Sequence, residues 1–131
     1  MAEISKETKI VLIFDAIAAF IFMCLYLIIP ELYASLVDPL VFDPYYWRAF
    51  GGTILALLII VLIAFKRAEW DQVKVVLEFA IIWTIIILSL NIWELIVLPI
   101  SPTYRQTTWI DSILLVVLIV INAFVYYREQ K

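Results

Sequence analysis

The chain has 131 residues, of which 66% are hydrophobic and 16% are charged, whereas an ordinary soluble domain is roughly 45–50% apolar and about 25% charged. A domain of this length keeps a large surface relative to its volume, so it cannot bury so much apolar surface in its own interior. The composition excludes a water-soluble globule and indicates a protein whose solvent is lipid.

The sequence also excludes most familiar active-site chemistry. It contains no histidine and a single cysteine, Cys24. Histidine-based metal sites, Ser/His/Asp or Cys/His triads and C-x-x-C redox chemistry are therefore excluded within one chain. The formal net charge of -3 argues against nucleic acid as a partner, because a nucleic-acid-binding protein would carry a basic face. We expect no catalytic residues, no metal ion and no cofactor.

Four apolar runs follow one another along the chain, at residues 10–29, 49–65, 73–98 and 109–127. Each is about long enough to cross the hydrocarbon core of a bilayer, and the first is longer than the apolar part of a signal peptide. Continuous runs of this length predict helices, since the strands of a membrane barrel would alternate over about ten residues. The predicted fold class is all-α: a polytopic membrane protein that forms one up-down-up-down bundle of four transmembrane helices.

Lysine and arginine predict the orientation of the bundle. Seven of the nine flank one side: Lys6, Lys9, Lys66, Arg67, Lys74, Arg128 and Lys131. The other side has Arg48 and Arg105. Because cytoplasmic loops carry the excess of positive charge, both termini are expected in the cytoplasm, with the chain in the cell membrane. Segment 30–47 mixes apolar and acidic residues, and we expect it to lie along the outer interface as a short helix and turn.

Polar side chains within the runs fall into two layers. Ionisable residues inside a membrane are costly, so each is a candidate site. The inner cluster, near the cytoplasmic anchors, consists of Asp15, Glu78 and Asn122. The outer cluster consists of Arg48, Asn91, Glu94 and Asp111.

Helical phase relates the two layers to each other. Asp111 and Asn122 are eleven residues apart and fall within roughly 20° of the same face. Glu78 and Asn91 are thirteen residues apart and differ by about 140°, so a continuous polar lane along residues 73–98 requires a broken helix.

Each cluster has a structural and a functional interpretation. In the outer cluster, Arg48 either forms a static ion pair with Glu94 or Asp111, or the group contacts a ligand or an ion. The acids of the inner cluster are either a proton-coupled site or hydrogen-bonded groups within the bundle, with Lys9 or Lys74 as the nearest cations. Among small residues, Gly52 and Ala56 have the spacing that allows close helix contact, either within the bundle or between copies of the chain. Trp83 and Trp93 either belong to the aromatic belt or face a groove.

The segment Tyr45-Tyr46-Trp47-Arg48-Ala49-Phe50-Gly51-Gly52, which leads into the second run, resembles the small DoxX-like four-helix membrane proteins, as does the preceding Pro-Glu-Leu-Tyr segment at residues 30–33. The resemblance covers most of the chain in layout but rests on one short motif. Some members are membrane subunits of respiratory or redox complexes, and the resemblance implies no catalytic residues here. Small multidrug transporters also have four helices and an acid in the first, but they lack this strong charge bias.

Two functions remain open. The first is a non-enzymatic bundle that serves as an accessory or partner-binding subunit, or that holds a lipid or quinone-like ligand between its helices. Its partners would be the bilayer and a second membrane protein or a further copy of this chain. The second is a small proton- or cation-coupled transporter or channel that uses Asp15 and Glu78, with Asn122 assisting. An intramembrane enzyme is disfavoured, because only carboxylate chemistry is open to it.

Overall fold

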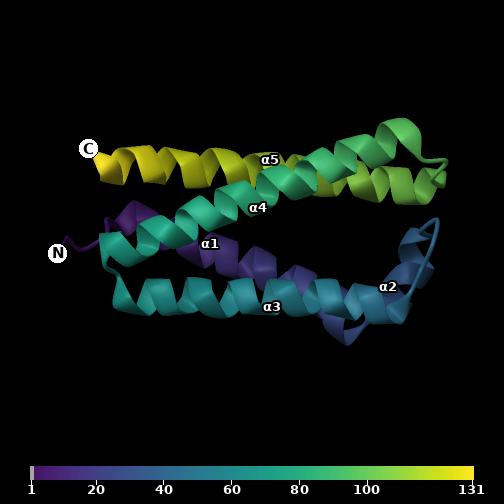
Figure 1. Ribbon diagram of the computed structural model, residues 1–131, viewed down its shortest axis with the longest axis horizontal. Coiled ribbons are helices and arrows are strands. Elements are labelled where there is room, and N and C mark those ends of the chain that lie inside the picture. Colours follow the sequence, from purple (N-terminus) through teal and green to yellow (C-terminus); the bar gives the residue numbers. More distant parts are fainter. Residues whose placement is uncertain (1) are drawn as a thin grey trace.

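A computed structural model describes residues 2–131, and all of its named elements are helices (Figure 1). The elements are α1 (Lys6–Met23), the π-helical segment η1 (Cys24–Ile28), α2 (Pro30–Val37), α3 (Pro44–Arg67), α4 (Trp70–Val97) and α5 (Pro102–Gln130). Within the described residues, four helices are long and apolar enough to cross a membrane: Lys6–Ile28, Pro44–Arg67, Trp70–Val97 and Pro102–Gln130. The predicted fold class is confirmed, and the chain is a small four-span membrane protein.

Helices α3 and α5 begin well before their apolar runs, because a capping side chain precedes each of them. Proline occupies the first position of α2, α3 and α5, where its missing N–H is not needed. The Ser101 hydroxyl accepts a hydrogen bond from the Tyr104 N–H at 3.1 Å, and Asp43 caps α3 in the same way through the Tyr45 N–H at 2.9 Å. Helix α5 therefore begins at Pro102, seven residues before the apolar run.

The bundle consists of two tightly packed helix pairs. Helix α1 packs mainly on α3, and α4 packs mainly on α5, whereas contacts between the pairs are sparser. Figure 1 shows both termini and the α3–α4 turn at one end of the bundle, with α2 and the α4–α5 connection at the other. All seven predicted inner lysines and arginines lie at or near the first of these ends, which we call the terminal end.

The core near the terminal end is closed. Five apolar side chains there are at most 1% exposed: Leu12, Val61, Val73, Leu77 and Val125. The N-terminal segment crosses this end, since the Ile4 N–H donates to the Ala68 carbonyl at 3.0 Å and the Trp70 N–H donates to the Ala2 carbonyl at 2.9 Å. The half of the bundle near the termini is therefore sealed by side chains and by this segment.

The outward faces of the long helices are apolar. Large side chains such as Ile17, Ile59, Ile82 and Val120 are at least half exposed. Contiguous apolar surface of this extent is unfavourable in water and is the normal surface of a membrane helix. The lipid bilayer is therefore the environment that these faces fit.

Segment 30–47 forms the helix α2 and a turn that ends at the start of α3, as the sequence predicts. Tyr33, Ala34 and Val37 of α2 are buried, while Leu32 and Leu36 are exposed. The Ser101 hydroxyl donates to the Asp38 carbonyl at 2.9 Å, which ties this segment to the start of α5.

Helix packing is close at Gly51 and not at Gly52, so the expected contact within the bundle at Gly52 and Ala56 is wrong. A Cβ atom added at Gly51 would lie 2.6 Å from the backbone nitrogen of Leu27, whereas one at Gly52 would meet nothing within 4 Å. Ala56 is exposed. Gly51 allows α3 to pack directly against η1, and this contact positions the aromatic residues described next.

Candidate functional site

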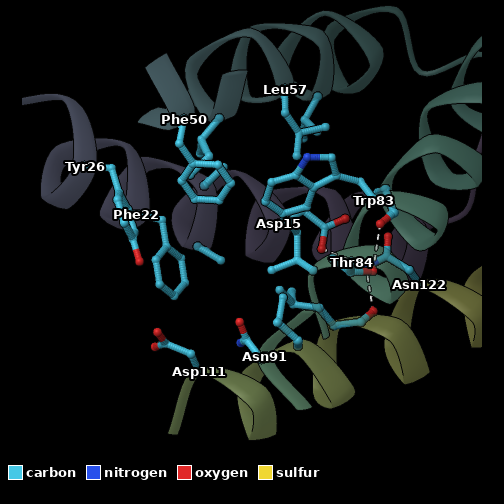
Figure 2. A pocket seen from close by; sticks show the side chains of 18 residues that line it. Asp15, Phe22, Tyr26, Phe50, Leu57, Trp83, Thr84, Asn91, Asp111 and Asn122 are labelled. Carbon is cyan, nitrogen blue, oxygen red and sulfur yellow. Dashed lines mark hydrogen bonds between the residues drawn. The ribbon is translucent and has the colours of Figure 1, made fainter. Parts of the chain in front are cut away.

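A cavity of about 120 Å³ lies between the two helix pairs and is lined by residues from α1, η1, α3, α4 and α5 (Figure 2). Most of its wall is apolar, with Ile54, Leu57, Leu115 and Leu118 among the aliphatic residues. The polar side chains in the wall are Asp15, Thr84, Asn91, Asp111 and Asn122. The cavity thus combines an apolar wall with a few convergent polar groups, the usual composition of a small-molecule site.

Asp15 and Asn122 form the polar end of the cavity nearest the termini. The Asn122 amide Nδ2 donates to the Asp15 carboxyl Oδ1 at 2.8 Å and to the Leu118 carbonyl at 2.8 Å. Asp15 is 9% exposed and Asn122 is 2% exposed. Asp15 Oδ2 and Asn122 Oδ1 have no hydrogen-bond partner among residues 2–131. Because an unpaired buried polar atom is costly, a hydrogen-bond donor placed beside these two acceptors would be stabilising.

Aromatic rings form the wall between the polar ends. The Phe50 and Trp83 rings are stacked, with centroids 6.0 Å apart and planes at 16°. Tyr26 meets Phe50 edge-on at 5.0 Å, and Phe22 stacks near Tyr26 at 6.5 Å. Tyr26 lies in η1, whose wider turn rotates the side chains that follow Met23. Such π-helical segments often occur at functional sites.

Asn91 and Asp111 line the opposite end of the cavity. Together with Tyr26, they also line a second cavity of about 30 Å³, whose wall includes Glu94 and Tyr104. The Asn91 amide contacts the Ser112 hydroxyl at a long 3.5 Å. Three of the four predicted outer residues, Asn91, Glu94 and Asp111, therefore lie around these two neighbouring cavities.

Arg48 is not part of this group. Its guanidinium forms a two-pronged ion pair with Glu31, with Nη1–Oε1 at 2.8 Å and Nη2–Oε2 at 3.0 Å. The expected pairing with Glu94 or Asp111 is wrong, because α2 folds back over the start of α3 and brings Glu31 within reach. The hydrogen bond from Arg48 lowers the pKa of the exposed Glu31 carboxyl below its usual value.

Glu78 lies outside the cavity as well. Its Oε1 accepts a hydrogen bond from the Tyr126 hydroxyl at 2.7 Å, and the residue is half-buried. Leu77, the preceding residue, is fully buried in the core, so Glu78 points about 100° away from that direction. Helix α4 is continuous through this region, and the phase difference between Glu78 and Asn91 therefore separates them. Of the predicted inner cluster, the structure brings together Asp15 and Asn122.

The neighbouring lysine does not reach Asp15. Lys9 Nζ pairs with Glu3 Oε1 at 2.8 Å on the surface. No lysine or arginine lines the main cavity in the part of the chain that the structure describes. Over the same residues, no group of three or more Asp, Glu, Cys or His side chains is arranged to hold a metal ion.

The sequence did not predict the aromatic wall, apart from the possibility that Trp83 faces a groove. Phe22 and Tyr26 are four residues apart, which places them on one helical face, but such pairs are common in apolar helices. Trp93, the other tryptophan considered for a groove, is 53% exposed. Which rings line the wall and which face lipid depends on how the helices pack, including the contact of Gly51 with Tyr26 and Leu27.

Comparisons of the chain with protein-family models, with curated proteins and with solved structures gave no match. The resemblance to DoxX-like proteins is therefore not supported by them, and no family is assigned. The structural class of a small four-span membrane protein rests on the helices themselves.

Proposed function

We propose that this protein is a non-enzymatic membrane bundle that binds a small ring-bearing apolar molecule, such as a lipid or quinone-like headgroup, between its helices. The observation that carries the proposal is the cavity between the helix pairs, with its aromatic wall and two unpaired acceptors at one end. A site of this kind would suit a subunit that holds or presents a ligand to a partner in the membrane.

The volume of the cavity supports a ligand of about one ring. An engineered cavity of about 150 Å³ lined by Leu, Ile and Phe binds benzene, and the present cavity, at about 120 Å³, is similar in size and lining. The two helix pairs contact each other less than the helices within each pair. We therefore propose that a tail attached to the ring leaves toward the lipid between these pairs.

Binding of toluene by the protein in nanodiscs tests the proposal. The Trp83 indole N–H signal in NMR reports occupancy of the cavity, and the signal of the exposed Trp93 reports partition of toluene into the surrounding lipid. We expect a saturable shift of the Trp83 signal alone. Leu118→Trp should fill the cavity and abolish that shift, whereas Val120→Trp, on the lipid-facing side of the same helix, should preserve it. Equal responses of Trp83 in both variants would contradict the proposal.

Coupled transport is a second candidate, favoured by the position of Asp15. The cavity extends from Asp111 at one end to Asp15 at the other. Among residues 2–131, no lysine or arginine pairs with Asp15. Transport would require the closed core around Leu12 and Val125 to open. Proton flux in proteoliposomes tests it: Asp15→Asn should abolish flux, and Glu78→Gln, outside the cavity, should leave it unchanged. Equal flux from the wild type and Asp15→Asn would exclude this function.

A further inference from the structure

Asp15 and Asn122 line one end of the cavity, and each has one unpaired atom whose chemistry indicates which polar group a ligand would carry there. Asn122 Oδ1 can only accept hydrogen bonds, and an ionised Asp15 carboxylate likewise only accepts. Both atoms are buried and unpartnered within residues 2–131. A ligand group that only accepts, such as a carbonyl, a carboxylate or a phosphate, would leave Asn122 Oδ1 unpaired. The complementary group is a donor with more than one hydrogen.

The charges of the cavity wall also favour a hydrogen-bond donor, and in particular a cation. Two acids, Asp15 and Asp111, line the cavity, and the described residues of its wall include neither lysine nor arginine. A cation in this space is attracted electrostatically by the two acids and is not repelled by any like charge in the described wall. An anion would meet two acids and no compensating group in a medium of low dielectric constant.

The aromatic wall adds a third, independent feature. Trp83, Phe50 and Tyr26 present rings to a space that also contains Asp15 (Figure 2). The faces of aromatic rings attract cations, and tryptophan does so most strongly. The same rings stack on the apolar body of an aromatic ligand. One end of the cavity therefore suits an ammonium group and the rest suits a ring.

We propose that the cavity binds primary arylalkylamines as cations, with the ammonium group donating to Asp15 Oδ2 and Asn122 Oδ1 and the ring lying against Phe50 and Trp83. This inference rests on the proposed function, since it names the class of molecule that enters the same cavity. The cavity volume of about 120 Å³ limits the body of the ligand inside the bundle to about one ring.

Three matched probes test the charge requirement: benzylamine as the cation, benzyl alcohol as a neutral donor of similar shape, and toluene as the ring without a polar group. Each is titrated against the protein in nanodiscs at neutral pH, with the Trp83 indole signal as the measure of binding and Trp93 as the control for partition into lipid. We expect benzylamine to bind at least about tenfold more tightly than either neutral probe, as a hydrogen bond to a charged group implies.

The variant Asp15→Asn keeps the shape of the side chain and removes its charge. It should weaken benzylamine binding by about tenfold or more and leave toluene binding nearly unchanged. Glu78→Gln removes an acid of the same bundle outside the cavity and should change neither. A thermal unfolding curve for each variant shows that the bundle is intact, and toluene binding by Asp15→Asn shows that the cavity itself is preserved.

The outcomes separate the two proposals. If toluene binds and benzylamine is no tighter, or if Asp15→Asn leaves the preference for benzylamine unchanged, the amine inference is overturned while the proposed function stands. If none of the three probes shifts the Trp83 signal of the wild type, both are overturned. If Asp15→Asn loses all toluene binding together with benzylamine binding, Asp15 supports the cavity structurally and the amine inference is overturned.

Discussion

Asn122 donates a hydrogen bond of 2.8 Å to Asp15 across the bundle, joining residues 107 positions apart in the chain and leaving one acceptor atom on each of them unpaired. This contact joins α5 to α1, which belong to different helix pairs. It is therefore both a link between the pairs and the polar end of the cavity.

The strength of this link can be measured with a double-mutant cycle on Asp15→Leu and Asn122→Leu. Each single substitution leaves the other polar group buried without its partner, so we expect each to lower the free energy of unfolding by about 1–3 kcal/mol. The double variant should be less destabilised than the sum, with a coupling of about 0.5–2 kcal/mol, the range found for polar pairs between membrane helices. Unfolding followed in bicelles measures all four proteins, and additive effects would mean that the two side chains do not interact.

Gly51→Ala and Gly52→Ala are a matched pair of variants that tests how closely α3 packs against η1. Gly51→Ala places a Cβ 2.6 Å from the Leu27 nitrogen, and we expect a loss of about 1–3 kcal/mol in the free energy of unfolding, as for other overpacked sites. Gly52→Ala meets nothing within 4 Å and should be neutral or stabilising by up to about 1 kcal/mol, since alanine favours a helix.

Toluene binding provides a second measurement on the same two variants. Gly51→Ala should also weaken toluene binding, because η1 carries Tyr26 into the cavity wall. Gly52→Ala should bind toluene as the wild type does. Equal stabilities for the two alanine variants would show that the close approach at Gly51 is absent in the membrane.

The ion pair between Arg48 and Glu31 predicts a small dependence of stability on pH. Since the pKa of Glu31 is lowered in the folded protein from an ordinary value of 4.5, the pair stabilises the fold above that value and its contribution is lost as the pH falls through the lowered pKa. Glu31→Gln should therefore melt below the wild type at neutral pH and match it in acid. High salt should reduce the difference, because the pair is exposed. A difference that persists in acid would assign the effect to packing of α2.

Orientation can be tested by labelling single cysteines with a membrane-impermeant maleimide in a Cys24→Ala background. Both termini, the α3–α4 turn and most of the basic residues share one end of the bundle, and the charge bias predicts that this end is cytoplasmic. Tyr45→Cys, at the exposed start of α3, should label in intact cells. Lys131→Cys should label only after the membrane is permeabilised, and the reverse pattern would overturn the predicted orientation.

The sequence predicted the features that depend on composition and on the phase of one helix. Four apolar runs predicted the spans, and the eleven-residue spacing of Asp111 and Asn122 placed both on one face, where both line the cavity. The spacing of Glu78 and Asn91 likewise predicted that α4 has no continuous polar lane. These results follow from helix geometry alone.

Features that depend on how helices rotate against one another could not be predicted. Whether Glu78 faces Asp15 depends on how α4 is rotated about its own axis. Long apolar helices carry little periodic signal from which this rotation could be predicted. The partner of Arg48 depends on the fold-back of α2 after η1, which is a tertiary arrangement. The aromatic wall includes Tyr26, which follows the close contact of η1 with Gly51, whereas the sequence alone indicated Gly52.

The central claim is that the cavity ending at Asp15 and Asn122 holds a ligand. It is tested most directly by identifying the molecules that stay bound when the protein is extracted from its own membrane. Native mass spectrometry of the protein extracted with its surrounding lipid, and of Leu118→Trp and Val120→Trp prepared in the same way, measures the retained molecules. We predict that one ring-bearing molecule per chain accompanies the wild type and Val120→Trp and is missing from Leu118→Trp. The same set of molecules on all three proteins would contradict the claim.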